Sequence, residues 1–367
     1  MPEPASLYPA HVLSLLSAQL PDCGVSRVAA RTGLDITGIQ VAAATRPLAA
    51  SAVQAYGGGV TLAAAMAEAA LAAIALRYAE AGVPPAAYGG VPADSLEVPF
   101  ELAGLALTPG SLVTPATPLD WITARPAGGG PGVLVPRDLV RLGRVPRGRW
   151  RPGALTAAAD GLAADLTRAA AVSRALCDIA AGEAAGAAGQ AAVLDLASAP
   201  GPWTAQVLGT VAAAGGTVSA AVLPAWPGLA CFSVRLWLPD TAPLVAEGTA
   251  ARPDPGAALG AAIAEAGCAR LELITGGGGV LTPRRRVVIA GPPDFPGPPV
   301  PWADLPSAVA GWPDPAAACD QDTAVLRSCA AAGAVPLAAD LCAHRTLAVV
   351  KVLAARHGAP AAREAAA

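Results

Sequence analysis

Three long alanine-rich segments, at residues 60–81, 165–189 and 254–269, constrain the fold of this chain most. Alanine has the highest helix propensity, so each segment is predicted to form a helix. Each follows a turn marked by glycine or proline, such as the glycine run 57–59 before the first helix. The recurrence hints at an internal repeat of strand, turn and helix, although alanine-rich helices resemble one another on composition alone.

Short apolar segments between these helices are rich in valine and alanine and are bounded by turn residues, which indicates strands. A proline inside 134–136 places that segment at a sheet edge. The sequence therefore predicts a mixed α/β (α+β) fold with several sheet segments. The strands are expected within 25–46 (a pair) and at 134–136, 193–196, 218–223, 231–238, 271–275, 335–340 and 347–353, with shorter helices at 201–214 and 324–333.

The length of 367 residues suits one large domain or two ordinary ones, and a single domain over 1–367 is the interpretation adopted. Residues 1–22 are expected to form a short N-terminal helix. The proline-rich stretch 292–315 is expected to be a surface loop, and residues 356–367 a flexible tail.

Charge and hydrophobicity exclude several classes of partner. The net charge is −3 and there is no basic block, so neither nucleic acid nor anionic lipid is an expected partner. Hydrophobic residues make up 54 %, but alanine supplies much of this. The most apolar window, 60–76, contains Glu68 and is short for a membrane span, and the N-terminus lacks a signal-peptide pattern. A cytoplasmic location is expected.

The seven cysteines are scattered without a CxxC pair, and the three histidines are not clustered. An odd number of separated cysteines argues against a disulfide framework and against a structural zinc site. Most of the cysteines are expected to be small buried hydrophobic residues.

Five groups of short motifs follow one another along most of the chain. They are Gly38-Ile39-Gln40-Val41 with Arg46-Pro47, Gly57-Gly58-Gly59, Asp160-Gly161-Leu162-Ala163-Ala164, Glu265 with Arg270, and Asp340-Leu341 with Ala348-Val349-Val350-Lys351-Val352. In this order they resemble the YcaO family, whose members carry GIPV and RP, GKG, NGLAAG, ExxQxR and DLT…PVVRV motifs. The resemblance implies a YcaO-like fold around a central nucleotide-type cleft.

The resemblance also implies a chemistry. Family members use ATP and Mg²⁺ to phosphorylate a backbone amide oxygen of a peptide, and a nucleophile then attacks the activated carbon. A Cys, Ser or Thr side chain gives an azoline such as a thiazoline, sulfide gives a thioamide, and an amine gives an amidine. Magnesium and cationic side chains neutralise charge on the transferred phosphoryl group. The implied partners are a precursor peptide and a second subunit in a homodimer or heterodimer.

Several of the family's metal-binding positions are replaced in this chain. The two glutamates of the first helix fall on Ala72 and Ala75, and the lysine of the GKG turn falls on Gly58. In the second helix the first glutamate falls on Asp178 and the second on Ala181. Magnesium needs hard oxygen ligands, which alanine does not offer.

The third helix keeps more of the pattern, with Glu265 and Arg270 retained and the glutamine replaced by Cys268. The remnant ATP and magnesium site implied by the resemblance therefore consists of Asp178, Glu265, Arg270 and Arg27. Glu265 and Asp178 are its candidate metal ligands.

Two functions compete. The first is a degenerate YcaO-like partner or scaffold subunit, which needs no cofactor itself and supports azoline formation by another subunit. The second is an active, divergent enzyme that uses ATP and Mg²⁺ to phosphorylate a peptide amide. A weaker alternative treats the glycine run 276–279 as a phosphate-binding loop after a strand at 271–275, although a glycine-rich hairpin is preferred. Cys268 as a nucleophile is disfavoured, because no histidine lies near it in the sequence.

Overall fold

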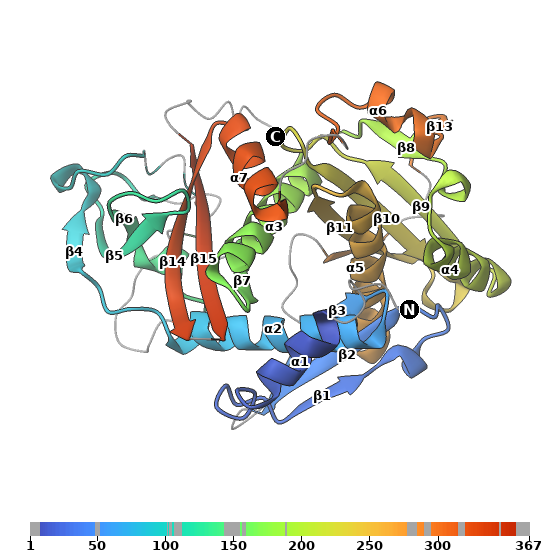
Figure 1. Ribbon diagram of the computed structural model, residues 1–367, viewed down its shortest axis with the longest axis horizontal. Coiled ribbons are helices and arrows are strands. Elements are labelled where there is room, and N and C mark those ends of the chain that lie inside the picture. Colours follow the sequence, from blue (N-terminus) through green and yellow to red (C-terminus); the bar gives the residue numbers. More distant parts are fainter. Residues whose placement is uncertain are drawn as a thin grey trace. The chain divides into compact units, whose positions relative to one another are not determined.

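The structure is a computed structural model that forms two compact units. Unit 1 comprises Met1–Ile74 with Cys177–Ser328, and unit 2 comprises Ala75–Leu176 with Cys329–Ala367 (Figure 1). The residues that the structure describes are 8–47, 52–100, 102, 105, 112–142, 155, 159–187, 189–276, 285–289, 295–314, 320–344 and 346–356.

Unit 1 contains two sheets. The smaller is an antiparallel sheet in the order β1 (Arg27–Ala30), β2 (Gln40–Pro47), β3 (Ala52–Gly59). The larger has the order β12-β11-β10-β9-β8-β13, and its neighbours are antiparallel except for the parallel pair β8 and β13. The strands of the larger sheet are β8 (Ala192–Leu194), β9 (Thr217–Val222), β10 (Ala230–Trp237), β11 (Leu244–Arg252), β12 (Arg285–Ile289) and β13 (Pro299–Val300).

Helix α5 (Pro255–Thr275) packs against both sheets of unit 1, contacting β10 and β11 of the larger sheet and β2 and β3 of the smaller one. Small residues permit this close approach: a Cβ added to Gly267 would lie 2.6 Å from a side-chain atom of Ile39. The helix begins where Asp254 accepts a hydrogen bond from the Ala257 backbone, and it ends at Gly276 in the left-handed region.

The strand predicted at 271–275 is wrong, because α5 continues to Thr275. Leu271 and Glu272 are good helix formers, and no helix-breaking residue precedes Gly276. The premise of the phosphate-loop alternative is therefore also wrong: the glycine run follows a helix, not a strand. Residues 277–279 lie outside the described residues.

The glycine run 57–59 is the end of strand β3 and not a turn. Successive residues of a strand face opposite sides, and here each side meets a helix. Gly57 and Gly59 face α2 (Leu62–Ala81), and Gly58 faces α5. A Cβ at Gly58 would lie 2.6 Å from the Ala264 carbonyl oxygen, so the three glycines let two helices pack against one strand.

The core of unit 1 lies between α5 and the larger sheet and extends to α4 (Pro202–Ala213), which contacts β9. Phe232 is fully buried there. Its ring stacks on Trp302, with centroids 5.8 Å apart, and meets Trp312 edge-on at 6.0 Å. The larger sheet is therefore packed by apolar side chains along β10.

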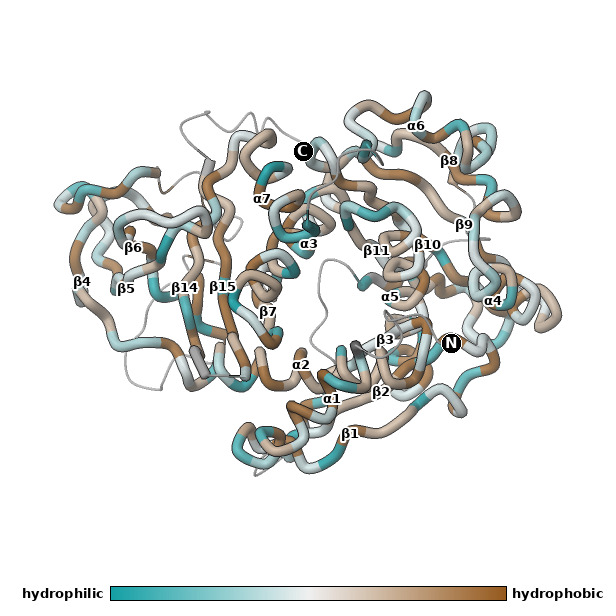
Figure 2. The backbone as a smooth tube through the Cα atoms, viewed as in Figure 1, coloured by the Kyte–Doolittle hydropathy of each residue, from teal (hydrophilic) through white to brown (hydrophobic). Residues whose placement is uncertain are grey.

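Unit 2 is built on a second six-stranded sheet with the path β4-β5-β14-β15-β7, and β6 pairs with β5. Strands β14 and β15 form its long central hairpin, and Figure 2 draws much of both in the brown of hydrophobic residues. Its strands are β4 (Tyr88–Pro92), β5 (Pro118–Pro126), β6 (Val133–Pro136), β7 (Leu162–Asp165), β14 (Ala334–His344) and β15 (Leu347–Arg356).

Most predicted elements are confirmed within a few residues, including the three long helices, of which α3 spans Arg168–Gly186. Strands β3, β4, β7, β11, β12 and β13 were not predicted. The N-terminal helix is α1 (Tyr8–Ser17), and the final helix is α7 (Gln321–Ala331). The proline-rich stretch holds β13, a 3₁₀ turn at Trp302–Asp304 and the short helix α6 (Leu305–Ala308). Residues 357–367 of the predicted tail lie outside the described residues.

Helix α2 is long and apolar enough to cross a membrane by length and composition, and half of its apolar window is buried in the protein. Its Ala65, Ala69 and Ile74 have no exposed surface. Together with the packing on Gly57 and Gly59, this burial is typical of a core helix. The cysteines in the described part of the chain are free thiols, and all but Cys342 are buried.

Candidate functional site

One side of α5 carries two carboxylates, Glu265 and Glu272, seven residues or two helical turns apart. Both bind Arg285, the first residue of β12. Its Nε donates to Glu265, and its Nη1 donates to Glu272 Oε1 at 3.1 Å. Its Nη2 donates to the Tyr56 carbonyl oxygen of β3 at 3.1 Å. A single guanidinium therefore joins α5, β12 and β3 within unit 1.

This cluster is largely removed from solvent: the side chains of Glu272 and Arg285 are 6 % and 11 % exposed. Burial raises the pKa of Glu272, and the attraction of Arg285 opposes that shift. Burial alone would lower the pKa of Arg285, but the charges of Glu265, Cys268 and Glu272 hold it well above its usual value. The guanidinium is therefore permanently charged and serves as the cluster's counter-ion.

Cys268 lies in the same cluster and is fully buried. Burial raises the pKa of its thiol to about 12, with Arg285 opposing the shift and Glu265, Glu272 and Glu68 adding to it. A thiol with this pKa stays protonated at neutral pH and is a poor nucleophile. The arrangement supports the packed-thiol interpretation of Cys268.

A repeated packing geometry relates α2 to α5. A Cβ on Gly57 of β3 would lie 2.7 Å from the backbone carbonyl carbon of Glu68 in α2. A Cβ on Gly248 of β11 would lie 2.6 Å from the same atom of Glu265 in α5. Each helix follows an antiparallel hairpin, β2-β3 or β10-β11. Glu68 and Glu265 therefore occupy equivalent places in two hairpin-helix units, which supports the internal repeat.

Glu68 and Glu265 are 197 residues apart in the sequence, and the same separation relates other positions of the two helices. It places Ala72 opposite Ala269 and Ala75 opposite Glu272. The resemblance assigned glutamates to Ala72 and Ala75. By the repeat, the corresponding pair in α5 is Ala269 and Glu272, of which only Glu272 carries a carboxylate.

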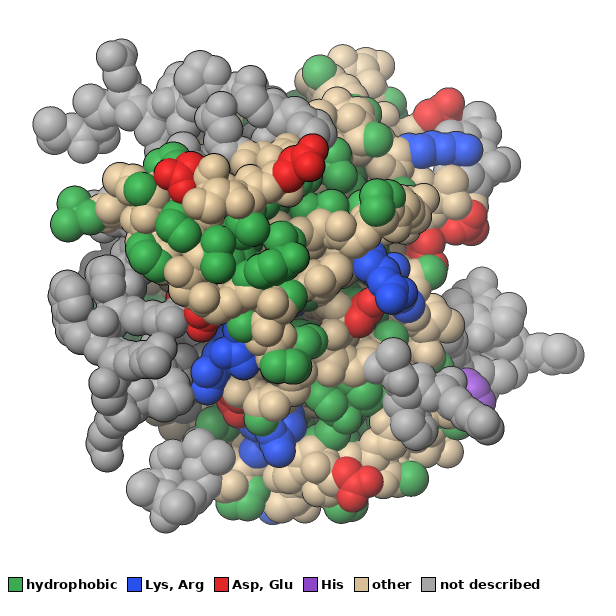
Figure 3. All heavy atoms as spheres, turned by 90° about the vertical axis from the view of Figure 1, so that its left-hand side faces the viewer, with side chains coloured by type: hydrophobic (Ala, Val, Ile, Leu, Met, Phe, Trp, Pro, Cys, Tyr) green, Lys and Arg blue, Asp and Glu red, His purple; other side chains and the backbone are tan. Residues whose placement is uncertain are grey.

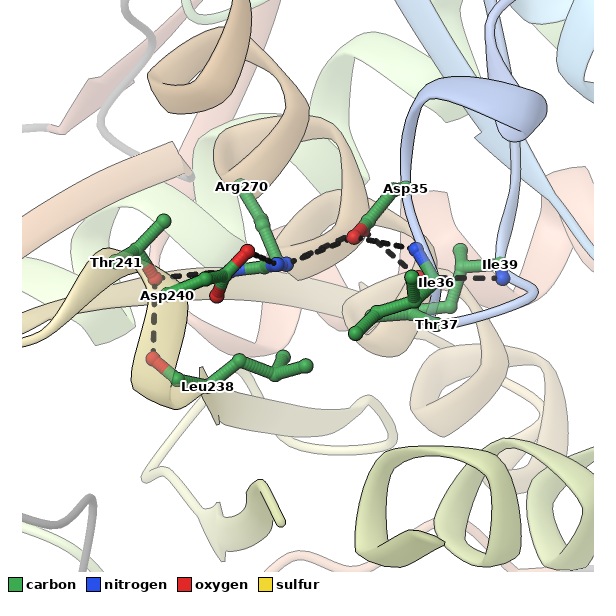
Figure 4. Close-up of polar contacts among 8 residues, drawn as sticks. All are labelled: Asp35, Ile36, Thr37, Ile39, Leu238, Asp240, Thr241 and Arg270. Atoms are coloured by element: carbon green, nitrogen blue, oxygen red, sulfur yellow. Dashed lines mark hydrogen bonds and ion pairs between the residues drawn. The ribbon is translucent and has the colours of Figure 1, made fainter. Parts of the chain in front are cut away.

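Arg270 lies in a different network. It is 1 % exposed, and its Nε donates to both Asp35 oxygens at 3.1 and 3.2 Å. Its Nη1 donates to Thr241 Oγ1 at 2.8 Å and its Nη2 to Asp240 Oδ2 at 2.7 Å (Figure 4). Asp35 in turn accepts hydrogen bonds from the Ile36 backbone and the Thr37 hydroxyl. Arg270 thus ties two loops to α5.

The four residues of the expected site have different surroundings. Glu265 binds Arg285, whereas Arg270 binds Asp35 and Asp240, so these two residues of α5 have separate partners. Asp178 is buried on α3. Arg27 is exposed on β1, an edge strand of the small sheet.

The residues present do not fit the magnesium site that the resemblance implies. Among the residues that the structure describes, no group of three or more His, Cys, Asp or Glu side chains is placed to hold a metal ion. Glu265, a candidate ligand, is already neutralised by Arg285. At Gly58, where the resemblance places a lysine, the backbone of α5 leaves no room for a Cβ.

Sequence reasoning missed Arg285, Glu272, Asp35 and Asp240. The seven-residue spacing of Glu265 and Glu272 was a usable signal, since it puts both on one side of a helix. The link to Arg285 was hidden because β12 was not predicted and no sequence motif pairs Arg285 with α5.

On the face drawn in Figure 3, the described side chains mix apolar, acidic and basic types. That face presents no extended basic field, in agreement with the net charge of −3.

The sequence matches one protein family over residues 52–356, the family described as "YcaO cyclodehydratase, ATP- and Mg²⁺-binding". It is also 31 % identical over 178 residues to an "Uncharacterized protein in tfuA 3'region" of Rhizobium leguminosarum bv. trifolii. That match covers 47 % of this chain and 41 % of the relative, so the chain spans less than half of the relative's length.

Solved structures with a similar fold include YcaO from Methanopyrus kandleri bound with AMPPCP and Mg²⁺, with a TM-score of 0.66 and 16 % identity over 95 % of this chain and 90 % of that one. A heterocyclase in complex with substrate and cofactor has a TM-score of 0.67 and 15 % identity over 95 % and 52 %. The E. coli microcin synthetase McbBCD complex has a TM-score of 0.60 and 8 % identity over 89 % and 87 %.

At these identities the structural likeness concerns the fold, and it confirms the predicted mixed α/β YcaO fold. The family match covers well over half of the sequence. This chain belongs to the YcaO family.

Proposed function

We propose that this chain is a degenerate YcaO component of a pathway that modifies a ribosomally synthesised peptide. In this role it is a partner or scaffold subunit that supports ATP-dependent azoline formation by another subunit. Its partners are a precursor peptide and an active YcaO chain or other biosynthetic subunit, with which it forms a dimer in the cytoplasm.

The observation that carries this proposal is the engagement of Glu265 and Glu272 by Arg285. A carboxylate can hold Mg²⁺ only if its oxygens are free to point at the ion. Here the Arg285 guanidinium forms ion pairs with both Glu265 and Glu272, in a site with little access to solvent. The family's two glutamates of the first helix are replaced by Ala72 and Ala75, which also reduces the number of carboxylates available to bind Mg²⁺.

A second support is the set of contacts that Arg270 makes. The resemblance assigned Arg270 to the nucleotide site, yet its guanidinium donates hydrogen bonds to Asp35, Asp240 and Thr241. All three guanidinium nitrogens of this buried arginine therefore donate to partners within the chain, which takes them away from a role in phosphate binding. The fold is retained while Glu265 and Arg270, which the resemblance assigned to the nucleotide site, form ion pairs within the chain, and this supports a subunit kept for assembly.

The test separates binding from chemistry. The purified chain is titrated calorimetrically with AMPPCP in the presence of Mg²⁺, alone and then mixed with each active YcaO chain encoded in the same genome. Azoline formation is followed by mass spectrometry as the loss of one water per ring from a precursor peptide. A variant of the partner that lacks its metal-binding glutamates serves as the control.

The proposal expects no heat of AMPPCP binding with the lone chain. It expects faster water loss from the peptide when this chain is added to the active partner, and none with the glutamate-free partner. ATP-dependent water loss catalysed by this chain alone would refute the proposal and favour the active-enzyme alternative.

A further inference from the structure

The Arg285 guanidinium is surrounded by oxygen atoms of the types that also bind divalent cations. Carboxylate oxygens come from Glu265 and Glu272 of α5, and a carbonyl oxygen comes from Tyr56 of β3. Hard oxygen donors of these two types are the preferred ligands of Mg²⁺ and Ca²⁺. In this chain they surround a guanidinium supplied by β12.

The charge balance around Arg285 shows why a cation is required there. Glu265 and Glu272 contribute two negative charges, and Arg285 contributes one positive charge. Within the described part of the chain, Glu272 Oε2 is buried and has no hydrogen-bond partner. Two carboxylates in a site this dry would repel each other strongly without a counter-ion.

We propose that Arg285 is a tethered cation that takes the place of a divalent metal ion between Glu265, Glu272 and the Tyr56 carbonyl. The inference extends the proposed function, because a chain that carries its own cation at this position gains nothing there from Mg²⁺. The guanidinium fixes β12 and β3 to α5, as a structural metal would, and it cannot dissociate.

The placement in the repeat agrees with this role. Glu272 is the repeat equivalent of Ala75, one of the positions to which the resemblance assigned a glutamate. In α2 that position is an alanine without a charge to neutralise. In α5 the carboxylate is retained, and it is the one that the guanidinium covers.

The test measures thermal unfolding of the full chain in Mg²⁺, in Mn²⁺ and in EDTA, for the unaltered protein and three variants. R285M removes the guanidinium and keeps both carboxylates. R285M/E265Q/E272Q removes all three charges together. R235M is the control, since Arg235 of β10 pairs with the buried Glu247 of β11 in the same unit, at 3.0 Å, and its guanidinium also lies 4.1 Å from the ring centroid of Phe295.

The unaltered protein is expected to have the same Tm in all three solutions. R285M should lose on the order of 10 °C in EDTA, because two carboxylates are left buried without a counter-ion, and it should recover part of that loss in Mn²⁺. The triple variant should be more stable than R285M in EDTA and indifferent to the metal. R235M should lose less than R285M and show no metal response.

Three results would overturn the inference: a Tm of the unaltered protein that rises with Mg²⁺, a loss in R285M no larger than in R235M, or a loss in R285M that neither Mn²⁺ nor removal of the carboxylates reduces. If R285M does not fold, E265Q/E272Q is compared with the triple variant. The inference expects the double variant to be the less stable, since it leaves a buried guanidinium without its carboxylates, and the reverse order would refute it. These measurements concern the stability of the lone chain and not its effect on a partner. The inference about Arg285 can therefore be refuted while the proposed partner-subunit function holds, and the proposed function can be refuted while the inference holds.

Discussion

Gly58 of β3 lies directly under Ala264 of α5, so close that a Cβ at Gly58 would be 2.6 Å from the Ala264 carbonyl oxygen. Real Cβ atoms do not approach a backbone oxygen to this distance. At this contact the backbone of β3 meets the backbone of α5. Neither element can move without disturbing the two sheets that α5 contacts. The family's lysine is therefore incompatible with the packing of this chain.

The substitution G58A is expected to lower the free energy of unfolding by about 1–3 kcal/mol, because overpacking forces α5 away from β3. Chemical denaturation of the two proteins measures the difference. G209A is the control: Gly209 is exposed in helix α4 and an added Cβ would meet nothing within 4 Å. That change should stabilise the protein by roughly 0.5–1 kcal/mol, as expected for Gly to Ala in a helix. A neutral or stabilising G58A would contradict the packing described here.

The Arg270 network predicts unequal roles for its two acidic partners. The Asp35 side chain is 7 % exposed and the Asp240 side chain is 53 % exposed. Removing the buried partner leaves the guanidinium of Arg270 without its main counter-ion, so D35N should cost about 3 kcal/mol. D240N should cost less than about 1 kcal/mol, since solvent screens its charge. Equal costs in urea unfolding would show that Asp35 is not the principal partner.

The extent of the helices could be predicted from sequence because alanine-rich segments carry a strong local propensity. The end of α5 could not, since Leu271 to Thr275 is equally compatible with a strand when read alone. What decides it is tertiary: Leu271 is buried, and Glu272 needs the helical register to reach Arg285.

The candidate site was harder to predict than the fold. Glu265 and Arg270 are five residues apart and were assigned to one remnant site, but five residues is not a whole number of helical turns. The two side chains therefore leave α5 in different directions and meet different partners. The ion pair between Glu272 and Arg285 depends on which strand lies beside β11, which the sequence of α5 does not contain.

Cys268 offers a prediction about reactivity. Because its thiol is buried with a pKa of about 12, it should resist alkylation in the native protein, whereas the half-buried Cys342 should react faster. Mass spectrometry of peptides after a brief iodoacetamide pulse at neutral pH compares the two sites. C268A should leave any effect on peptide modification intact and lower stability by about 1 kcal/mol through a small cavity. Rapid native labelling of Cys268, or loss of function in C268A at full stability, would restore the nucleophile hypothesis.

Lys351 is the only lysine in the sequence, and it is buried in β15 of unit 2. Its Nζ donates to the Asp160 carbonyl oxygen in the turn before β7, and the Val352 backbone donates to the neighbouring Gly161 carbonyl at 2.7 Å. Burial lowers the pKa of Lys351 from 10.5 to about 8, with the charge of Asp160 opposing the shift. The folded protein therefore releases this proton more easily than the unfolded chain does.

The sign of the resulting pH dependence follows directly. Below pH 8 the amine is protonated in both states, and the folded state bears the cost of a buried charge. Between about pH 8 and 10.5 the unfolded chain binds more protons, so the free energy of unfolding should rise with pH, by about 3 kcal/mol in total. K351M should lack this rise, because its side chain does not titrate. K351R should also lack it and be less stable than K351M above pH 8, because a guanidinium stays charged.

Comparing each variant with the unaltered protein at the same pH cancels the titration of tyrosines and other cysteines, which the variants share. Urea unfolding at several pH values from 7 to 10.5 gives the three profiles. An amine-reactive reagent supplies an independent measurement, since apart from the N-terminus Lys351 is the sole target in the sequence. The rate at which Lys351 is labelled in the native protein reports how often unit 2 opens around β15. This rate is first corrected for the fraction of amine that is neutral at each pH. The corrected rate should fall as the free energy of unfolding rises with pH. A stability profile that is the same in K351M and the unaltered protein would mean that the buried amine is not the titrating group.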